Sequence, residues 1–247
     1  KVRKATGKEK DKLKSTFTGK LIKDGGSEGR EEATGLGGLF VLQAILGKLG
    51  LKGRLTAAVQ GFGNVGYNVA KFLDEAGITV VAVSDSKGGI FVADGLNPTT
   101  TLECKQKTGK LAGCYCKGSV CDVKNGRHIS NEELLELPVD ILVPSALESV
   151  VTGANASHIK AKVVLEMANG PTTPEADTLL YKRGIVVIPD ILANSGGVTV
   201  SCFEWEQNVK NLKWSEDEVL AKLKPIMVDA FNKVWEIKEK YNIPMRT

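Results

Sequence analysis

Three glycines spaced as G-x-G-x-x-G are the residues of this chain with the clearest chemical meaning. The motif consists of Gly61, Phe62, Gly63, Asn64, Val65 and Gly66. The first glycine allows a tight turn, the second lets the backbone approach a pyrophosphate, and the third lets a helix pack closely on a strand. The amide groups at the start of the following helix would then face the phosphates. The motif predicts a dinucleotide-binding loop.

An acidic residue lies where such a loop requires one. Asp85 ends the next apolar run, so its carboxylate would accept hydrogen bonds from the adenosine ribose. This carboxylate favours NAD, because it repels the 2′-phosphate of NADP. However, Ser86, Lys87 and Gly88 follow directly and could hold that phosphate through a hydroxyl and a cation. The choice between NAD and NADP stays open, and a glycine-rich turn without a ligand is the alternative to both.

The segments around the loop alternate between strand and helix. Short apolar runs predict buried strands at 55–60, 78–84, 139–143, 163–167 and 185–188. Apolar residues at helical spacing predict helices at 31–49, 64–76 and 219–237. Further helix starts are marked by two capping boxes and a Thr-Pro pair, at Ser130/Glu133, Ser215/Glu218 and Thr173-Pro174. This alternation predicts an α/β fold, a doubly wound, mostly parallel Rossmann-type sheet with helices on both faces.

The composition is that of an ordinary globular protein. Of 247 residues, 42% are hydrophobic and 25% are charged, which argues against disorder, collagen-like repeats and a disulfide scaffold. No apolar run approaches the roughly 20 residues that cross a bilayer. The amino-terminal residues also lack the apolar core of a signal peptide. We therefore expect a cytoplasmic protein with no membrane partner.

Positive charge is concentrated at the amino-terminal end. Residues 1–23 contain nine basic side chains against two acidic ones, although the whole chain has a net charge of only +4. A basic segment could contact nucleic acid. It contains one aromatic residue, Phe17, and no nucleic-acid-binding signature, so we expect no such partner. We interpret 1–23 as a solvated basic connecting segment and 24–247 as one NAD(P)-binding domain.

Four of the five cysteines lie close together, at Cys104, Cys114, Cys116 and Cys121. Their C-x₉-C-x-C-x₄-C spacing matches no template for a zinc or iron site, even with His128 as a further ligand. Disulfides are rare in cytoplasmic proteins. We therefore expect a loop of reduced thiols, with a metal site as the alternative.

Four segments resemble the glutamate dehydrogenases, within the wider glutamate/leucine/phenylalanine/valine dehydrogenase family. The segments are GSEGREEATG at 26–35, VQGFGNVG at 59–66, ANGPTTPEA at 168–176 and IPDILANSGGVTVS at 188–201. They occur in the family's order, and the resemblance covers nearly the whole chain from about Thr18 onward. It is a resemblance to the family's cofactor-binding domain alone.

The resemblance implies which residues bind the cofactor. Thr34 would meet the nicotinamide carboxamide, and Asn64 and Val65 would contact the cofactor phosphates. Asn169 and Asn194 would line the nicotinamide ribose and the substrate. These implied roles suit polar side chains beside glycine-rich turns, which can present hydrogen-bond donors to an amide ring.

The resemblance also implies substrate contacts. Arg30 would reach a substrate carboxylate and Ser201 would hold the distal carboxylate, with Asn169 beside them. The alternatives are a surface ion pair of Arg30 with the neighbouring glutamates, and a hydroxyl of Ser201 that only lies on a helix side. Three positions near this site depart from the family pattern and leave the pocket shape open: Met167, Ser195 and Cys202.

The activity implied for the intact enzyme is reversible oxidative deamination of L-glutamate to 2-oxoglutarate and ammonia with NAD or NADP, in a homo-hexamer. The family's catalytic lysine and aspartate belong to segments of a substrate domain, and neither segment occurs in this sequence. We expect the domain alone to be inactive, and a monomer or weak dimer. The alternatives are a leucine-, phenylalanine- or valine-type dehydrogenase domain and a non-catalytic NAD(P)-binding regulatory module.

Overall fold

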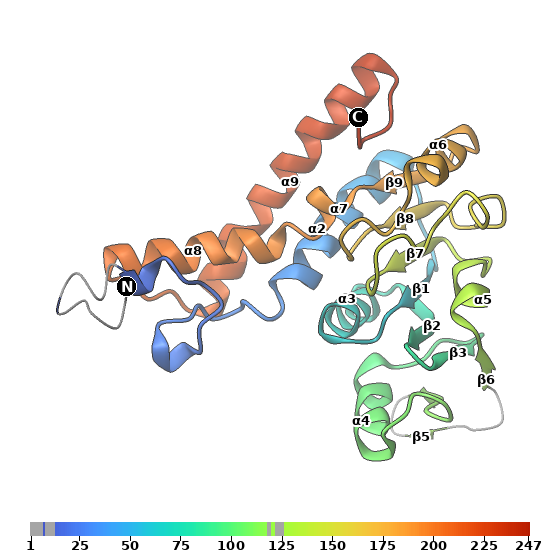
Figure 1. Ribbon diagram of the computed structural model, residues 1–247, viewed down its shortest axis with the longest axis horizontal. Coiled ribbons are helices and arrows are strands. Elements are labelled where there is room, and N and C mark those ends of the chain that lie inside the picture. The colour runs from blue at the N-terminus through green and yellow to red at the C-terminus, as the bar shows by residue number, and fades with distance from the viewer. Residues whose placement is uncertain (1–6, 8–12, 118–119, 122–125) are drawn as a thin grey trace.

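A seven-stranded sheet underlies the fold, with the strands in the order β6–β3–β2–β1–β7–β8–β9 (Figure 1). The computed structural model describes residues 7, 13–117, 120–121 and 126–247, with the backbone alone at 116–117 and 120–121. The strands of this sheet are β1 (Thr56–Gln60), β2 (Thr79–Asp85), β3 (Gly88–Val92), β6 (Gly126–Ile129), β7 (Ile141–Pro144), β8 (Val163–Leu165) and β9 (Val186–Ile188).

Most neighbouring strands of this sheet run parallel. The five strands from β2 to β9 form one parallel block, whereas β3 is antiparallel to both β2 and β6. Ser86 and Lys87 are the turn residues between β2 and β3, because Asp85 pairs with Gly88. The predicted mostly parallel sheet is confirmed, with an antiparallel edge that we did not predict. A separate small sheet joins β4 (Cys116–Lys117) to β5 (Val120–Cys121).

Helices cover both faces of the large sheet, as predicted. Ala57 and Val59 of β1 belong to one apolar cluster, with residues of α2, α3, α8 and α9, while Ala58 belongs to a second cluster with α5 and α6. Successive residues of a strand point to opposite faces, so β1 is buried on both. The helices are α2 (Ala33–Leu49), α3 (Asn64–Glu75), α4 (Pro98–Thr108), α5 (Asn131–Leu135), α6 (Pro174–Lys182), α7 (Asp190–Ala193), α8 (Gly196–Lys210) and α9 (Glu216–Tyr241), with a 3₁₀ turn η2 (Ile22–Asp24).

The three predicted helix starts are confirmed. At both capping boxes the serine hydroxyl accepts a hydrogen bond from the glutamate amide, and the glutamate carboxylate accepts one from the serine amide. Thr173 caps α6, and Pro174 is its first residue. The sequence analysis assigned no element to α4, α7 or α8, so these helices are additions to the prediction.

The basic segment predicted at 1–23 is only partly visible, because residues 1–6 and 8–12 lie outside the described residues. The described part is held on α8. The Lys20 ammonium lies 2.6 Å from a carboxylate oxygen of the fully buried Glu204, and the Gly19 amide donates to the same carboxylate at 2.8 Å. Gly19 is nevertheless exposed and Lys20 is half-buried, so these two residues are anchored on α8, while the basic connecting segment and the domain division at residue 24 stay predictions.

The long helix α8 extends away from the sheet toward the amino-terminal segment, and α9 runs back past α2 to the carboxyl-terminal end (Figure 1). Gly196, at the start of α8, allows this helix to approach α2, because a Cβ at this position would overlap the carbonyl oxygen of Ala33. In the part of the chain that the structure describes, no helix combines the length and the apolar character needed to cross a membrane.

Candidate functional site

The glycine loop joins β1 to α3 with the geometry that its spacing predicts. Gly61 has a φ of +95°, a conformation that side chains disfavour, and its amide donates to the carbonyl oxygen of Ser84 at 3.0 Å. A Cβ at Gly66 would overlap the Gly61 carbonyl oxygen, so only glycine lets α3 pack this closely on the loop. The structural roles predicted for the first and third glycines are therefore confirmed.

The start of α3 offers an open site for an anion. No side chain caps this helix end, so the first-turn amides at Asn64 and Val65 are available as donors. A Cβ built on Gly63 would meet no protein atom within 4 Å, so the space in front of this glycine is free for a ligand to approach the backbone. The Asn64 side chain is itself oriented by a 3.1 Å hydrogen bond from Asn68. The loop therefore fits a pyrophosphate.

A polar cavity of about 390 Å³ opens beside this helix start. Six of the residues that we singled out from the sequence line it, although they come from segments far apart in the chain. They are Arg30, Thr34, Val65, Asn169, Asn194 and Ser201. We call this the polar cavity. Met167, one of the departures from the family pattern, also lines it and is almost fully buried.

Two hydrogen bonds organise the side chains of the polar cavity. The Arg30 Nε donates to Ser201 Oγ at 3.0 Å, and the Asn194 side-chain amide donates to Asn169 Oδ1 at 2.8 Å. The alternative for Arg30, an ion pair with the adjacent glutamates, is not found among the described residues. Gly197 is needed at this point, because a Cβ there would lie 2.5 Å from the Thr34 hydroxyl oxygen.

A buried ionic network lies behind the polar cavity, and sequence motifs did not reveal it. The fully buried carboxylate of Glu166 accepts hydrogen bonds from the Asp190 amide and from the guanidinium of Arg246. The Asp190 carboxylate in turn accepts from the Gly170 amide at 2.7 Å. Burial alone would lower the pKa of Arg246, but Glu166 and Asp177 raise it above its usual value, so Arg246 stays charged. The network fixes the two loops that carry Asn169 and Asn194.

The predicted acidic residue lies at the other end of the glycine loop, and both of its oxygens have partners. Asp85 Oδ1 accepts from the Lys87 amide at 2.9 Å, and Oδ2 lies 3.0 Å from the ammonium of Lys105. Lys105 Nζ also donates to the carbonyl oxygen of Phe62 at 3.1 Å. We call Phe62, Asp85, Ser86, Lys87 and Lys105 the Asp85 site. The sequence analysis missed Lys105, which belongs to α4.

The cysteine cluster corrects another expectation. Cys104 and Cys114 form a disulfide, with Cα atoms 5.6 Å apart, so they are neither free thiols nor metal ligands. The reason is local: Gly109 ends α4 in the left-handed conformation, and the chain then turns back along the helix. The side chains of Cys116 and Cys121 lie outside the described residues, and their backbones pair between β4 and β5. The residues that the structure describes include no cluster suited to a metal ion.

Comparisons with known proteins agree with this architecture. The model of the Glutamate/Leucine/Phenylalanine/Valine dehydrogenase family matches residues 25–247. The NADP-specific glutamate dehydrogenase of Synechocystis sp. is 47% identical over 234 residues, which are 94% of this chain and 55% of that protein. The glutamate dehydrogenase of Thermotoga maritima is 50% identical over 232 residues, 93% of this chain and 54% of that protein.

A solved structure shares the fold as well. The hetero-hexameric glutamate dehydrogenase from Thermus thermophilus, in its leucine-bound form, superimposes with a TM-score of 0.83 at 34% identity. The match covers 93% of this chain and 52% of that one. This chain therefore spans about half the length of the relatives that it matches. On the sequence match and the fold together, the chain belongs to the glutamate/leucine/phenylalanine/valine dehydrogenase family.

Proposed function

We propose that this chain is the NAD(P)-binding domain of an amino-acid dehydrogenase whose substrate is L-glutamate. One observation carries the proposal: the polar cavity joins the start of the phosphate-binding helix, at Val65, to the Arg30–Ser201 pair. A dinucleotide that lies along the glycine loop would thus reach side chains suited to a carboxylate substrate. A module that only senses a nucleotide has no need of side chains that bind a carboxylate substrate.

The chain's own residues divide the work of binding. The first-turn amides of α3, at Asn64 and Val65, would hold the cofactor phosphates. Thr34 and the Asn169–Asn194 pair would orient the nicotinamide end, and the bound cofactor would supply the hydride acceptor for the substrate Cα. Overall, L-glutamate and water give 2-oxoglutarate and ammonium while NAD(P)⁺ becomes NAD(P)H and one proton is released.

The substrate preference rests on Arg30 and Ser201. Arg30 supplies a fixed positive charge and Ser201 a hydroxyl, and the two are already within hydrogen-bond distance of each other. A dicarboxylate offers both groups an anionic hydrogen-bond partner, whereas a leucine- or phenylalanine-type side chain offers them none and would desolvate them. This difference favours glutamate over the branched-chain and aromatic amino acids.

We also propose that the domain alone does not turn over substrate. Deamination needs a general acid and base close to the reacting carbon. Among the described residues that line the polar cavity there is no lysine, histidine, aspartate or glutamate. The missing groups would come from a substrate domain in a hexameric enzyme, while this chain by itself would be a monomer or weak dimer.

Calorimetric titration of the purified chain with NAD, NADP and their reduced forms tests the proposal. We expect at least one of the four to bind with one-to-one stoichiometry, and glutamate to produce no reduced nicotinamide. Absence of binding to all four would overturn the cofactor role. Glutamate-dependent reduction of NAD(P) by this chain would overturn the claim that it is inactive alone.

A further inference from the structure

The Asp85 carboxylate, which should discriminate against NADP, is neutralised by a lysine. Lys105 Nζ lies 3.0 Å from Asp85 Oδ2, and the two side chains are only 25% and 14% exposed. The same ammonium donates to the carbonyl oxygen of Phe62, inside the glycine loop. An ammonium has three hydrogens, and among the described residues these two contacts use two of them. One donor of Lys105 is therefore left for a ligand.

The surroundings of this pair are cationic. Lys87 lies in the exposed turn directly after Asp85, so the two lysines and one carboxylate leave a net positive charge. The ring of His128, on β6, covers Gly88, where a Cβ would lie 2.9 Å from its Nε2. The Ser86 hydroxyl adds a further donor. A phosphate monoester is a doubly charged anion near neutral pH, and such a site attracts it.

We propose that Lys105 is the specificity-determining residue of the Asp85 site: it binds the 2′-phosphate of NADP, so the chain binds NADP at least as tightly as NAD. The inference rests on the proposed function and deepens it. The Lys105 ammonium cancels the repulsion that Asp85 would exert on the 2′-phosphate and donates its third hydrogen to a phosphate oxygen. In NAD the ribose 2′-hydroxyl is uncharged, so it gains little from Lys105.

Two small ligands isolate this contact. The nucleotides 5′-AMP and 2′,5′-ADP differ only by the 2′-phosphate, and both can be titrated calorimetrically together with NAD and NADP. For Lys105→Met we expect affinity for 2′,5′-ADP and NADP to fall about 10- to 100-fold, because a charge-assisted bond is lost and the charge of Asp85 is no longer neutralised. Affinity for 5′-AMP and NAD should stay within about 3-fold, since these ligands lack the phosphate.

Matched variants control for folding and for general charge. Lys107→Met removes an exposed lysine two residues further along α4 and should leave all four affinities unchanged. Lys105→Arg keeps the charge and should retain tight binding of 2′,5′-ADP. Asp85→Asn keeps Lys105 and should strengthen the binding of 2′,5′-ADP. This variant tests the proposal even if the methionine variant does not fold. Raising the salt concentration should weaken the binding of NADP more than the binding of NAD.

The outcomes separate the two claims. If 5′-AMP and NAD bind but Lys105→Met leaves 2′,5′-ADP and NADP unchanged, the role of Lys105 is wrong and the proposed function stands. Wild-type NADP binding weaker than NAD binding would also overturn the inference. If no nucleotide binds, the proposed function fails, and this inference fails with it.

Discussion

The polar cavity and the Asp85 site lie at the two ends of one loop, yet they are built differently. In the polar cavity, short side chains and Arg30 are held by glycines that bring α8 against α2. At the Asp85 site, one long side chain reaches in from α4, a helix that carries no family motif. In the roles proposed above, the substrate contacts are thus positioned by backbone packing, whereas the choice between NAD and NADP depends on one side chain, Lys105.

The loop that joins the two regions should give the largest effect. In Gly66→Ala the new Cβ meets the Gly61 carbonyl oxygen, so we expect about 2–4 kcal/mol of lost stability and weaker binding of every nucleotide. Gly63→Ala is the matched control, because its Cβ meets no protein atom. This variant should leave the free energy of unfolding nearly unchanged but should still weaken nucleotide binding. Denaturant unfolding and calorimetry measure the two effects. Equal destabilisation by both variants would contradict this account of the loop.

Removing the disulfide should affect the Asp85 site alone. The bond joins residues 10 apart in sequence and encloses Lys105, and its loss in Cys104→Ser with Cys114→Ser should cost about 2–3 kcal/mol. We expect 2′,5′-ADP to bind less tightly, because the end of α4 that carries Lys105 is no longer tied to the following turn. Cys202→Ser, at an exposed free thiol, should change neither stability nor binding. Unchanged stability of the double variant would contradict a structural role for the bond.

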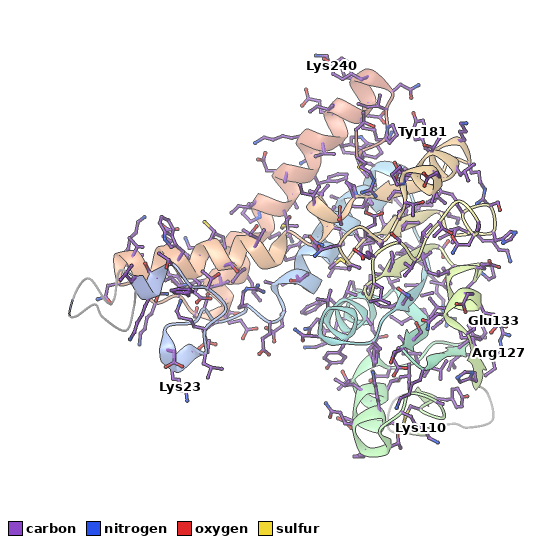
Figure 2. All side chains as sticks on the ribbon, in the orientation of Figure 1. Lys23, Lys110, Arg127, Glu133, Tyr181 and Lys240 are labelled. Atoms are coloured by element: carbon purple, nitrogen blue, oxygen red, sulfur yellow. A yellow bond between two sulfur atoms is a disulfide. The ribbon has the colours of Figure 1, made fainter. Side chains whose placement is uncertain are left out.

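Figure 2 shows Lys110, in the turn closed by this disulfide, at the same end of the molecule as Arg127 and far from Lys23 of the amino-terminal segment. Amide hydrogen exchange should therefore distinguish the Asp85 site from the polar cavity. In the double serine variant, which lacks the disulfide, hydrogen exchange should quicken around 104–114 and stay unchanged around Arg30 and Ser201.

Asp140 provides a reference point that belongs to neither region. It accepts hydrogen bonds from the Thr56 amide at 2.9 Å and from Lys162 at 2.8 Å, at the amino-terminal ends of the parallel strands. Burial acts to raise the pKa of Asp140, but these bonds lower it overall below its usual 3.8. Because the folded pKa is the lower one, the stabilisation is full above 3.8 and is lost as the pH falls through the folded value.

Asp140→Asn should accordingly lower stability by about 1–2 kcal/mol at neutral pH, and the difference from wild type should vanish in strong acid. The affinities for 5′-AMP and 2′,5′-ADP should equal those of the wild type. Asp94→Asn, at an exposed carboxylate, is the control and should leave the unfolding curve unchanged at every pH. A difference that persists in acid would show that the carboxylate charge is not the cause.

The smallest effect is expected inside the polar cavity. Asn194→Ala removes the 2.8 Å hydrogen bond to Asn169, and NAD affinity should fall about 3- to 5-fold. Affinity for 5′-AMP should not change, because this ligand ends before the cavity. An equal loss for both ligands would mean that the two regions are not independent.

Elements with a strong local signal were predictable from the sequence. The β1–α3–β2 unit follows from its glycine spacing and its apolar runs, and Thr173-Pro174 marks the start of α6. The polar cavity was predictable only through the family resemblance, because Arg30 and Ser201 are 171 residues apart. Nothing in local spacing places them together.

The elements that escaped prediction lack such signals for physical reasons. In α4 only Pro98 and Thr101 are buried, so the helix has no apolar stripe to recognise. Its packing beside α3 nevertheless positions Lys105 on Asp85. At the start of α8, the pair Gly196 and Gly197 is typical of a loop in the sequence. The structure shows instead that both positions need glycine because α2 approaches closely. Long-range packing, rather than local propensity, decides both cases.

The contacts of Glu204 and Ser201 connect two parts of the chain through one rigid turn of α8. Glu204 grips the backbone of Gly19 and Lys20, and Ser201, one turn earlier on the same helix, contacts Arg30. Three residues of α-helix span only about 4.5 Å, and they do not bend as a loop would. A displacement of the chain at Gly19 is therefore expected to move Ser201, at the edge of the polar cavity, together with Glu204. The position of Gly19 and the geometry of the Arg30–Ser201 pair are thus coupled through one turn of α8.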